Sequence, residues 1–321
     1  MLTVLLATKN RARILREVLE AYCRLEAPVS GWKVVVVDNG STDETPEVLA
    51  SFAARLPLQW IVEPQAGKNV ALNAGLKLAE GDLCVFTDDD AFPRADWLVQ
   101  LRKAADAQPG CAMFGGVVLP RWEATPPNWF RWVNQAAVFT LTEPGLEEGM
   151  LDPREIYGPN MAVRAEIFTA GVSFDPGIGP SGASYAMGSE TELVTRLGRL
   201  GHKAWHVKDA VVEHFIRVEQ LQQSWVLERA VRFGRGQYRL YGPGGRSNPP
   251  RFRGVPMYLY RKMLKQAVLA AAGRIAFQPE IAFRAHWRLN VFRGEVYEAR
   301  MLAKEGRPAT RVAHVGAGSG R

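Results

Sequence analysis

The chain has 321 residues, of which 47% are hydrophobic and 23% charged, and this balance excludes disordered and collagen-like proteins. Its apolar runs are shorter than the roughly 18 residues that a membrane span requires, and its first residues lack the basic start of a signal peptide, so we expect a cytoplasmic protein. Residues 217–321 hold 20 Lys and Arg against 6 Asp and Glu, which is a net charge of +14. The whole chain carries +7, so residues 1–216 carry −7. This asymmetry predicts an anionic partner for the basic part.

The first ninety residues alternate short β-branched runs with helix-like stretches. Strands are expected at 2–7, 34–37, 58–62 and 83–86, and helices at 11–25, 42–54 and 69–79. Such alternation predicts βαβ units on a mostly parallel sheet, which is an α/β fold. Ligands of such sheets bind at the carboxyl ends of the strands.

Beyond residue 90 the pattern is more mixed. We expect helices near 95–107 and 191–200, strands near 112–119 and 160–164, and a loop at 120–132 with three prolines and three tryptophans. From residue 218 onward the pattern is helical, with helices expected at 218–241, 255–277 and 280–302. The predicted organisation is therefore an α/β domain at 1–216 and a basic helical C-terminal region at 217–321.

Three adjacent carboxylates, those of Asp88, Asp89 and Asp90, follow directly after the fourth predicted strand. A hard cation such as Mg²⁺ or Mn²⁺ would stabilise this cluster, and such ions accept carboxylates together with the oxygens of a diphosphate. The alternative is a solvated acidic turn that caps the next helix. The metal site is favoured because the run ends a buried strand. Repulsion among the three carboxylates predicts that Asp90→Ala leaves the stability without metal unchanged or raises it.

Polar residues also follow the other strands. Asp38 ends the second strand, where acidic residues of nucleotide-binding sheets bind a base or ribose; helix capping is the alternative, although Asp38 lies early for it. Lys9, Arg11, Lys68 and Asn73 come from loops at the same edge, where basic groups and helix amino termini suit phosphate. Together these loops predict a polyanion site.

Four segments occur in a fixed order: ATKNR, VVVDNGSTDET, GKNVALNAGLKLAEGD and FTDDD. Together they resemble the nucleotide-sugar half of family 2 glycosyltransferases of the GT-A fold. The resemblance covers about residues 1–216, with 1–110 as the nucleotide-sugar-binding half and 111–216 as the acceptor-binding half. It implies a Rossmann-like sheet flanked by helices, and inverting transfer of a sugar from a nucleoside diphosphate donor with a divalent metal at an Asp-x-Asp motif.

The resemblance also implies roles for individual residues. Asp88 and Asp90 would hold Mn²⁺ or Mg²⁺, and a UDP-sugar is the first expectation because uridine is common in the family. Family members often carry a His near the position of His214, which would ligate the metal or touch the diphosphate; a purely structural His remains equally open, because Mg²⁺ prefers oxygen. The implied nucleotide contacts are Thr8, Asn10, Arg11, Asp38, Lys68, Asn73, Asp88 and Asp89.

The segment MGSETELVTRLGRLGHKAWHV resembles the helix start at which the family keeps its catalytic base. The common form has two acids before the Thr, but here Ser189 takes the first place, so Glu190 aligns with the base. Glu190 also lies near the positive end of the helix dipole, although charge complementarity at a helix start is the alternative. Inverting transfer needs such a carboxylate to accept the proton of the acceptor hydroxyl.

The acceptor side is less defined. By the resemblance, Asn160 and the loop that begins near Trp122 fall where the family meets its acceptor, and Glu192 would be a structural acid on that side. Trp122, Trp129 and Trp132 could stack on a sugar or a lipid-linked acceptor; for each alone, anchoring of the loop is preferred.

Segment 255–302 places apolar residues at helical spacing among Lys and Arg residues. This composition suits a helix on an anionic membrane surface, and a packed helical hairpin with a basic outer face is an equal alternative. Nucleic acid is disfavoured because no recognised binding motif accompanies the charge.

The predicted function is that of a hexosyltransferase-like glycosyltransferase of class EC 2.4 that modifies a glycan or glycolipid of the cell envelope. It would work in the cytoplasm, held peripherally at the inner face of the membrane. A sugar nucleotidyltransferase is the enzymatic alternative, but ATKNRAR lacks the glycines of that class. A catalytically inactive membrane-surface binding protein is the other, and the intact TDDD segment and Glu190 argue against it.

Overall fold

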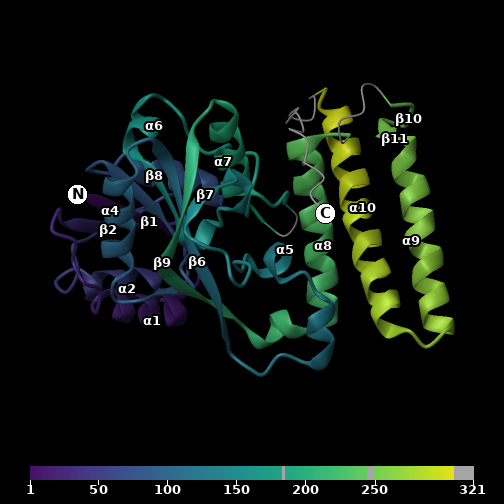
Figure 1. The fold of residues 1–321 in the computed structure, drawn as a ribbon, viewed down its shortest axis with the longest axis horizontal. Coiled ribbons are helices and arrows are strands. Elements are labelled where there is room, and N and C mark those ends of the chain that lie inside the picture. The colour runs from purple at the N-terminus through teal and green to yellow at the C-terminus, as the bar shows by residue number, and fades with distance from the viewer. Residues whose placement is uncertain (183–184, 244–248, 307–321) are drawn as a thin grey trace. The chain divides into compact units, whose positions relative to one another are not determined.

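The computed structural model describes residues 1–182, 185–243 and 249–306, and the chain divides into two compact units (Figure 1). The first unit comprises residues 1–123, 139–182 and 189–216, and the second comprises 124–138, 183–188 and 217–321. Residues 183–184, 244–248 and 307–321, which include the end of the predicted C-terminal region, lie outside the described residues.

The first unit is built on a nine-stranded mixed sheet with the order β3-β2-β1-β4-β8-β6-β9-β5, in which β7 also pairs with β9. The strands on one side of this order are parallel: β1 (Leu2–Thr8), β2 (Trp32–Asp38), β3 (Leu58–Val62) and β4 (Leu83–Phe86). β8 (Met161–Arg164) runs antiparallel to β4 and β6 (Cys111–Trp122). β9 (Lys203–Ile216) is parallel to β6 and antiparallel to β5 (Ala91–Pro93) and β7 (Gly149–Leu151).

The four predicted parallel strands are confirmed. Val34, Val35, Val36 and Val37 are all fully buried, because helices cover both faces of this part of the sheet. The sequence analysis does not predict β9 as one strand. Its pairing with β6 moves from Gly116 opposite Val207 to Val117 opposite Val211, so residues 208–210 form a bulge. Two of these bulged residues are charged, which interrupts the apolar pattern on which the prediction depends.

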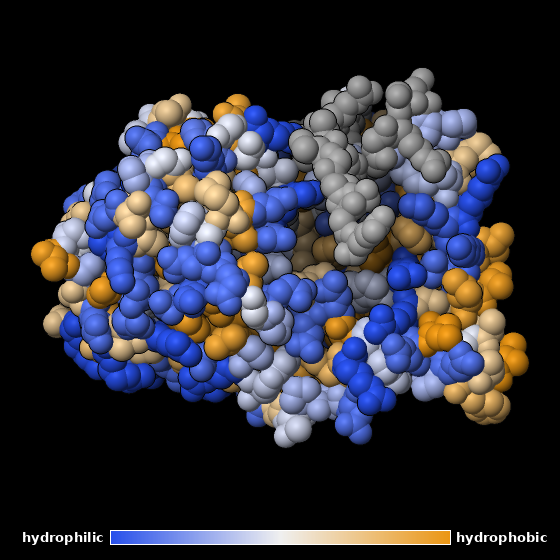
Figure 2. Space-filling view, in the orientation of Figure 1, coloured by the Kyte–Doolittle hydropathy of each residue, from blue (hydrophilic) through white to orange (hydrophobic). Residues whose placement is uncertain are grey.

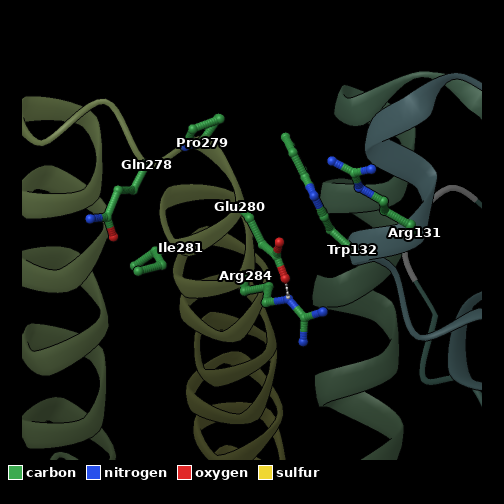
Figure 3. A pocket seen from close by; sticks show the side chains of 7 residues that line it. All are labelled: Arg131, Trp132, Gln278, Pro279, Glu280, Ile281 and Arg284. Carbon is green, nitrogen blue, oxygen red and sulfur yellow. Dashed lines mark ion pairs between the residues drawn. The ribbon is translucent and has the colours of Figure 1, made fainter.

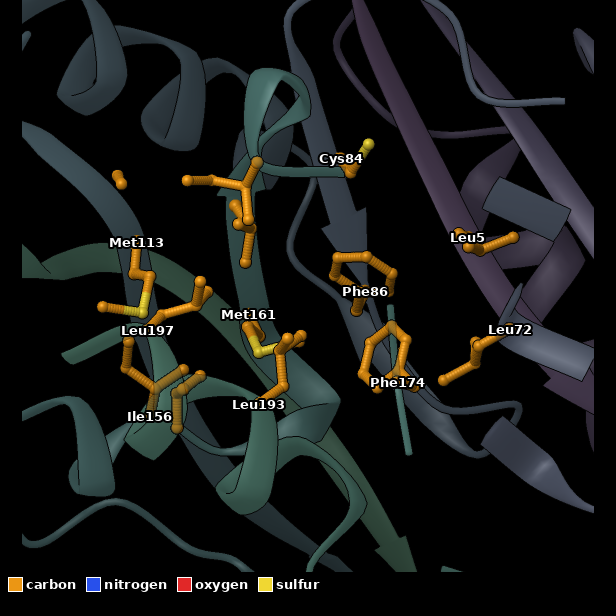
Figure 4. Packing of buried hydrophobic residues seen from close by; sticks show 14 of the residues in the cluster. Leu5, Leu72, Cys84, Phe86, Met113, Ile156, Met161, Phe174, Leu193 and Leu197 are labelled. Carbon is orange, nitrogen blue, oxygen red and sulfur yellow. The ribbon is translucent and has the colours of Figure 1, made fainter. Parts of the chain in front are cut away.

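Helices of the first unit pack on the two faces of its sheet. They are α1 (Ala12–Tyr22), α2 (Thr45–Phe52), α3 (Lys68–Leu76), α4 (Trp97–Ala107), α6 (Ala165–Thr169) and α7 (Ser189–Arg199). The short α5 (Gln135–Phe139) belongs to the second unit except for Phe139, its last residue. Leu5 and Phe86 of the strands pack in one cluster with Leu72 of α3 and Leu193 of α7 (Figure 4). Gly75 lets α3 lie close to the sheet, because a Cβ there would collide with the side chains of Leu5 and Val37.

The second unit is helical, as the sequence predicts. Its helices are α8 (Gln223–Tyr241), α9 (Met257–Ile275) and α10 (Pro279–Lys304), with a small hairpin of β10 (Arg251–Phe252) and β11 (Val255–Pro256). Tyr238, Leu259 and Val296 belong to its apolar core. Glu298 is fully buried and forms ion pairs with Arg235 at 2.8 Å and with Arg239. Within residues 1–182, 185–243 and 249–306, the search for a helix long and apolar enough to cross a bilayer finds none.

Candidate functional site

Strand pairing in the first unit brings Asp90 and His214 together. The chain leaves β4 at Phe86, passes through Asp88 and Asp89, and enters β5 at Ala91. Ala91 lies opposite His214 in the antiparallel pair with β9, and the Phe215 N–H donates to the Asp90 carbonyl at 2.8 Å. His214 is therefore part of β9 and faces the acidic segment.

Asp88, Asp90 and His214 each offer one ligand atom, and these three atoms all lie within 4.8 Å of one another. The His214 Nε2 is 3.4 Å from Asp90 Oδ1, and its Nδ1 lies 2.9 Å from the Phe139 carbonyl. A carbonyl only accepts, so Nδ1 carries a proton and Nε2 points at the cluster. Two carboxylates and an oriented imidazole are a donor set that suits Mn²⁺, so these residues fit the predicted metal.

The carboxylates of this segment are surrounded by cations. Arg11 Nη1 lies 2.7 Å from Asp90 Oδ2 and 3.7 Å from Asp89 Oδ1. Burial opposes ionisation of Asp90, but the hydrogen bonds and charges of His214 and Arg11 outweigh it and hold the pKa of Asp90 well below its usual range. Removal of Asp90 would therefore take a carboxylate away from both Arg11 and His214. The expected relief of repulsion in Asp90→Ala does not fit these contacts.

Asp89 and His214 respond differently to their surroundings. Burial raises the pKa of Asp89 to about 6, although the charge of Arg11 and a hydrogen bond from the Thr8 hydroxyl at 2.7 Å oppose the rise. Burial alone would lower the pKa of His214, but the hydrogen bond and charge of Asp90 raise it. The site thus combines a strongly ionised Asp90 with a less ionised neighbour.

Lys68 connects this cluster to Glu190. Lys68 is the first residue of α3, and its Nζ lies 2.5 Å from Asp88 Oδ1 and 2.5 Å from Glu190 Oε1. Burial would lower the pKa of Lys68, but the charges of Asp88 and Glu190 raise it, so the ammonium remains charged. The predicted base and Asp88, one of the predicted metal ligands, therefore share one half-buried cation.

Gly158 makes room for the Glu190 side chain. Glu190 is in the first turn of α7, as predicted, and its side chain is only 16% exposed. A Cβ on Gly158 would lie 2.5 Å from Glu190 Cδ and 2.8 Å from its Oε1, closer than non-bonded atoms approach. The absence of a side chain at Gly158 is thus a condition for the position of the Glu190 carboxylate. The sequence analysis does not predict this role.

Asp38 and Asn10 order the loops that follow β1 and β2. Asp38 lies opposite Thr8 at the ends of these strands, and its Oδ1 accepts the Ser41 N–H at 2.8 Å, so it also closes its own turn. Asn10 has a left-handed backbone with φ 52°, which Asn tolerates better than most residues. Its Oδ1 accepts the Thr42 N–H at 2.7 Å, which ties the two loops together.

Asn39 is a residue that the sequence analysis misses. Its amide donates to the Glu63 and Gln65 carbonyls at 2.8 Å each, and its Oδ1 accepts the Gly67 N–H at 2.8 Å. It thereby fixes the segment immediately before Lys68. An Asn-Gly pair after a strand indicates a turn, and this signal does not disclose the cross-loop bonds.

Other predicted residues lie elsewhere in the unit. Asn73 is occupied with the backbone of Phe174, to which its amide donates at 2.8 Å and from which its carbonyl accepts at 2.9 Å. Asn160 is fully buried and bonds to the Trp97 indole, the Val117 carbonyl and the Ala210 carbonyl. These contacts do not favour the predicted nucleotide role of Asn73 or the predicted acceptor role of Asn160.

Glu192 and Trp122 also make contacts within the protein. Glu192 forms a two-pronged ion pair with Arg196 one turn later, at 2.8 and 2.9 Å, which fits the predicted structural acid. The Trp122 ring packs edge-on against Phe139 at 6.0 Å between centroids, as an anchor of the loop would. The site that the structure brings together contains Thr8, Arg11, Lys68, Asp88, Asp89, Asp90, Glu190 and His214.

Sequence comparison relates the first half of the chain to one family. Residues 3–155 match the profile described as Glycosyl transferase family 2. This segment, slightly less than half of the chain, is therefore similar to that family. The Glucosyl-dolichyl phosphate glucuronosyltransferase of Haloferax volcanii is 24% identical to this chain over 207 residues, which cover 62% of this chain and 64% of the relative. The chain thus spans slightly less than two thirds of that relative's length.

Solved structures show the same fold. The mannosyltransferase PcManGT from Pyrobaculum calidifontis, in complex with GDP-Man and Mn²⁺, superposes with a TM-score of 0.61 at 19% identity and covers 94% of this chain and 87% of its own. Residues 1–349 of Staphylococcus aureus TarS, in complex with UDP-GlcNAc, give a TM-score of 0.55 at 14% identity and cover 95% and 92%. The predicted GT-A fold with a C-terminal helical extension is confirmed.

Proposed function

We propose that this protein transfers a sugar, with inversion, from a nucleoside diphosphate donor to an acceptor hydroxyl, with Glu190 as the general base. The observation that carries the proposal is the bridge through Lys68, which holds the Glu190 carboxylate and the Asp88 carboxylate 2.5 Å from one ammonium. Inverting transfer requires a base beside the acceptor hydroxyl and positive charge beside the leaving diphosphate, on opposite sides of the same sugar ring. The proposed reaction uses both sides of this bridge.

A divalent ion, Mn²⁺ or Mg²⁺, held by Asp88, Asp90 and His214 would supply charge that stabilises the diphosphate of the donor and of the leaving group. Lys68 has three N–H donors, of which Asp88 and Glu190 use two, so one remains for a phosphate oxygen. Arg11 adds a second cation beside Asp90. Thr8 and Asp38 lie opposite each other at adjacent strand ends, which supports their assignment to the base and ribose.

The proton and electron pairs balance without a further reactant. Glu190 accepts the proton of the acceptor hydroxyl while that oxygen forms a bond to the anomeric carbon. The bond from this carbon to the diphosphate oxygen breaks, and its electron pair leaves with the nucleoside diphosphate. Attack from the side opposite the leaving group inverts the anomeric centre.

The donor and acceptor are proposed by class. UDP-sugar remains the first expectation, and the GDP-Man and UDP-GlcNAc complexes of the solved neighbours support a purine and a pyrimidine nucleotide as the two donors to compare. The relative named for glucosyl-dolichyl phosphate supports a glycan or lipid-linked acceptor, in keeping with envelope synthesis at the inner face of the membrane. Residues 1–110 would bind the donor and 111–216 the acceptor.

Ligand-dependent stabilisation tests the donor. A ligand that binds only the folded protein must raise the melting temperature, so UDP- and GDP-sugars are compared with and without Mn²⁺. The proposal predicts a shift for a nucleoside diphosphate sugar that depends on the metal. Release of pyrophosphate from a sugar phosphate and a nucleoside triphosphate would instead support the nucleotidyltransferase alternative. Absence of both responses would contradict the proposal.

A further inference from the structure

Helix α9 is apolar on two opposite faces. Leu259, Ala270 and Gly273 are buried on the inner face, where the Gly273 backbone approaches that of Ala282 in α10. The outer face carries a second stripe at helical spacing, made of Met257, Leu264, Val268 and Ile275, which are 45%, 67%, 59% and 79% exposed. A surface helix normally has a polar outer face, so this outer stripe calls for a partner.

The turn between α9 and α10 exposes more apolar surface. Phe277 is 92% exposed and Ile281 is 46% exposed, directly beyond Ile275. Phe277 has φ 52°, and the bonds from the Phe277 N–H to Arg274 and from the Gln278 N–H to Gly273 make this a helix end at which glycine is the usual residue. The chain thus keeps a bulky aromatic side chain in a strained and exposed position, which suggests that the ring is buried when the protein works.

Cations surround this surface. Residues 257–275 contain four Lys and Arg and no acidic residue, and Arg261, Lys265 and Arg274 are exposed beside the outer stripe. Figure 2 shows the resulting mixture of hydrophobic and hydrophilic side chains along the right edge, where Figure 1 places α9. This combination fits a partner that offers both negative charge and an apolar interior.

A recess of about 570 Å³ opens at the same corner of the second unit. Arg131, Trp132, Ile281 and Arg284 line it, and Glu280, which also lines it, pairs with Arg284 at 2.9 Å (Figure 3). Guanidinium groups beside an indole are suited to the phosphate and ester region of a lipid head group.

We propose that the outer stripe of α9 and the α9–α10 corner bind the surface of a bilayer that contains anionic phospholipid. Ile275, Phe277 and Ile281 enter the boundary between head groups and acyl chains, while Arg261 and Lys265 contact the head groups. A second copy of the chain is disfavoured as the occupant, because two α9 helices would oppose cation to cation. This inference does not depend on the proposed transfer reaction.

The test is co-sedimentation of the full chain with vesicles of phosphatidylcholine alone and of phosphatidylcholine mixed with phosphatidylglycerol, at low and high salt. Binding should require the anionic lipid and weaken with salt. Phe277→Gly should reduce binding about tenfold, while the melting temperature is unchanged or raised because glycine suits the left-handed position. Arg261→Glu with Lys265→Glu should reduce binding to anionic vesicles at least about tenfold.

Leu200→Ser is the control for loss of an exposed apolar side chain elsewhere, because Leu200 lies in the first unit and is 65% exposed. Its binding should equal that of the unchanged chain. Failure of the folded chain to bind anionic vesicles at low salt would overturn the proposal. Binding by Phe277→Gly and by the Arg261→Glu, Lys265→Glu variant that equals that of the unchanged chain would also overturn it. A dimer in solution that Phe277→Gly dissociates would assign the surface to a second copy instead.

Discussion

The two units of this protein place their charges in opposite ways. In the first unit, buried and half-buried carboxylates are matched by half-buried cations, so that Lys68 pairs with Asp88 and Glu190, and Arg11 pairs with Asp90. In the second unit, the buried Glu298 is paired with Arg235 and Arg239, whereas the cations along α9 face outward beside exposed apolar residues. Carboxylates and cations that pair away from water hold each other in fixed positions, as reacting groups require. Cations that face outward are suited to association with a separate anionic surface.

The largest expected effect tests whether the geometry of the first unit is catalytic. Glu190→Gln keeps the shape but removes the proton acceptor, so turnover should fall about 10²- to 10⁴-fold while donor binding remains. Donor binding is measured by thermal shift and turnover by release of the nucleoside diphosphate. The matched control is Glu192→Gln, which breaks the Arg196 ion pair and should lower stability more than turnover. The reverse outcome would move the base to Glu192.

Gly158 offers a test of geometry without any change of charge. In Gly158→Ala the new Cβ would collide with Glu190 Cδ and displace the carboxylate. Turnover should fall about 10- to 100-fold at unchanged donor affinity, since small displacements of a reacting group have effects of this size. Gly110→Ala is a suitable control, because a Cβ there meets no atom within 4 Å. Normal turnover in Gly158→Ala would mean that Glu190 can be placed otherwise.

Asp90→Ala tests the matching of charges. It should abolish the response of the melting temperature to Mn²⁺. Without metal it should lower the free energy of unfolding by about 1 to 3 kcal/mol, because Arg11 and His214 each lose the Asp90 carboxylate. The pKa of Asp90 is depressed in the folded protein, so its contribution is present above the unfolded value near 3.8 and is lost as the pH falls below it.

The control for Asp90 is Asp106→Ala. Asp106 pairs with Arg102 on the surface, where its side chain is 66% exposed, and its loss should change stability by less than about 1 kcal/mol. Chemical denaturation at pH 7 and pH 3 measures both variants. If Asp90→Ala were more stable than the unchanged chain at pH 7, repulsion among the carboxylates, as the sequence predicts, would be the larger effect.

The smallest expected effect compares two glutamates of the second unit. Burial raises the pKa of Glu295 to about 7, against the charge of Lys262. Its contribution to stability is therefore present below the unfolded pKa of 4.5 and is lost as the pH rises through about 7. Glu295→Gln should stabilise the protein by about 1 to 2 kcal/mol at pH 8 and change little at pH 4.

Glu298→Gln should act in the opposite direction, because it removes the charge that Arg235 and Arg239 share. Thermal unfolding at the two pH values distinguishes the two substitutions. Equal effects of both variants at pH 8 would show that local cations do not decide the energy of a buried acid in this unit.

The sequence predicts the first four strands and the placement of Asp88, Lys68 and Glu190, because buried parallel strands are apolar runs and their carboxyl ends meet at one edge. The GT-A fold and the similarity to the family follow from motifs that stand at these ends. The strand β9 is not predicted, since Lys208 and Asp209 lie in its bulge.

The sequence also does not predict the partners of polar side chains that bind backbone groups. Asn73, Asn160 and Asn39 are of the same residue type, yet Asn73 and Asn160 bond to loop and core groups, whereas Asn39 positions the segment before Lys68. Which groups an Asn amide bonds to depends on which loops the folded chain brings close to it. One sequence does not contain that information. The exposure of Phe277 is equally a property of how α9 and α10 pack.

The bulge of β9 determines the face of the sheet on which His214 lies. His206 lies opposite Gly115 of β6, and His214 lies opposite Pro120. The two histidines are an even number of residues apart along β9, whereas their partners are an odd number apart along β6. The bulge therefore places the side chains of the two histidines on opposite faces of the sheet. In a regular strand these histidines would share a face. If the insertion or deletion of one residue in segment 208–210 shifted the pairing of β9 with β6 by one position, His214 would turn away from Asp90. A shift of two positions would keep His214 on the same face. The length of this segment is therefore expected to vary in steps of two wherever the histidine is kept.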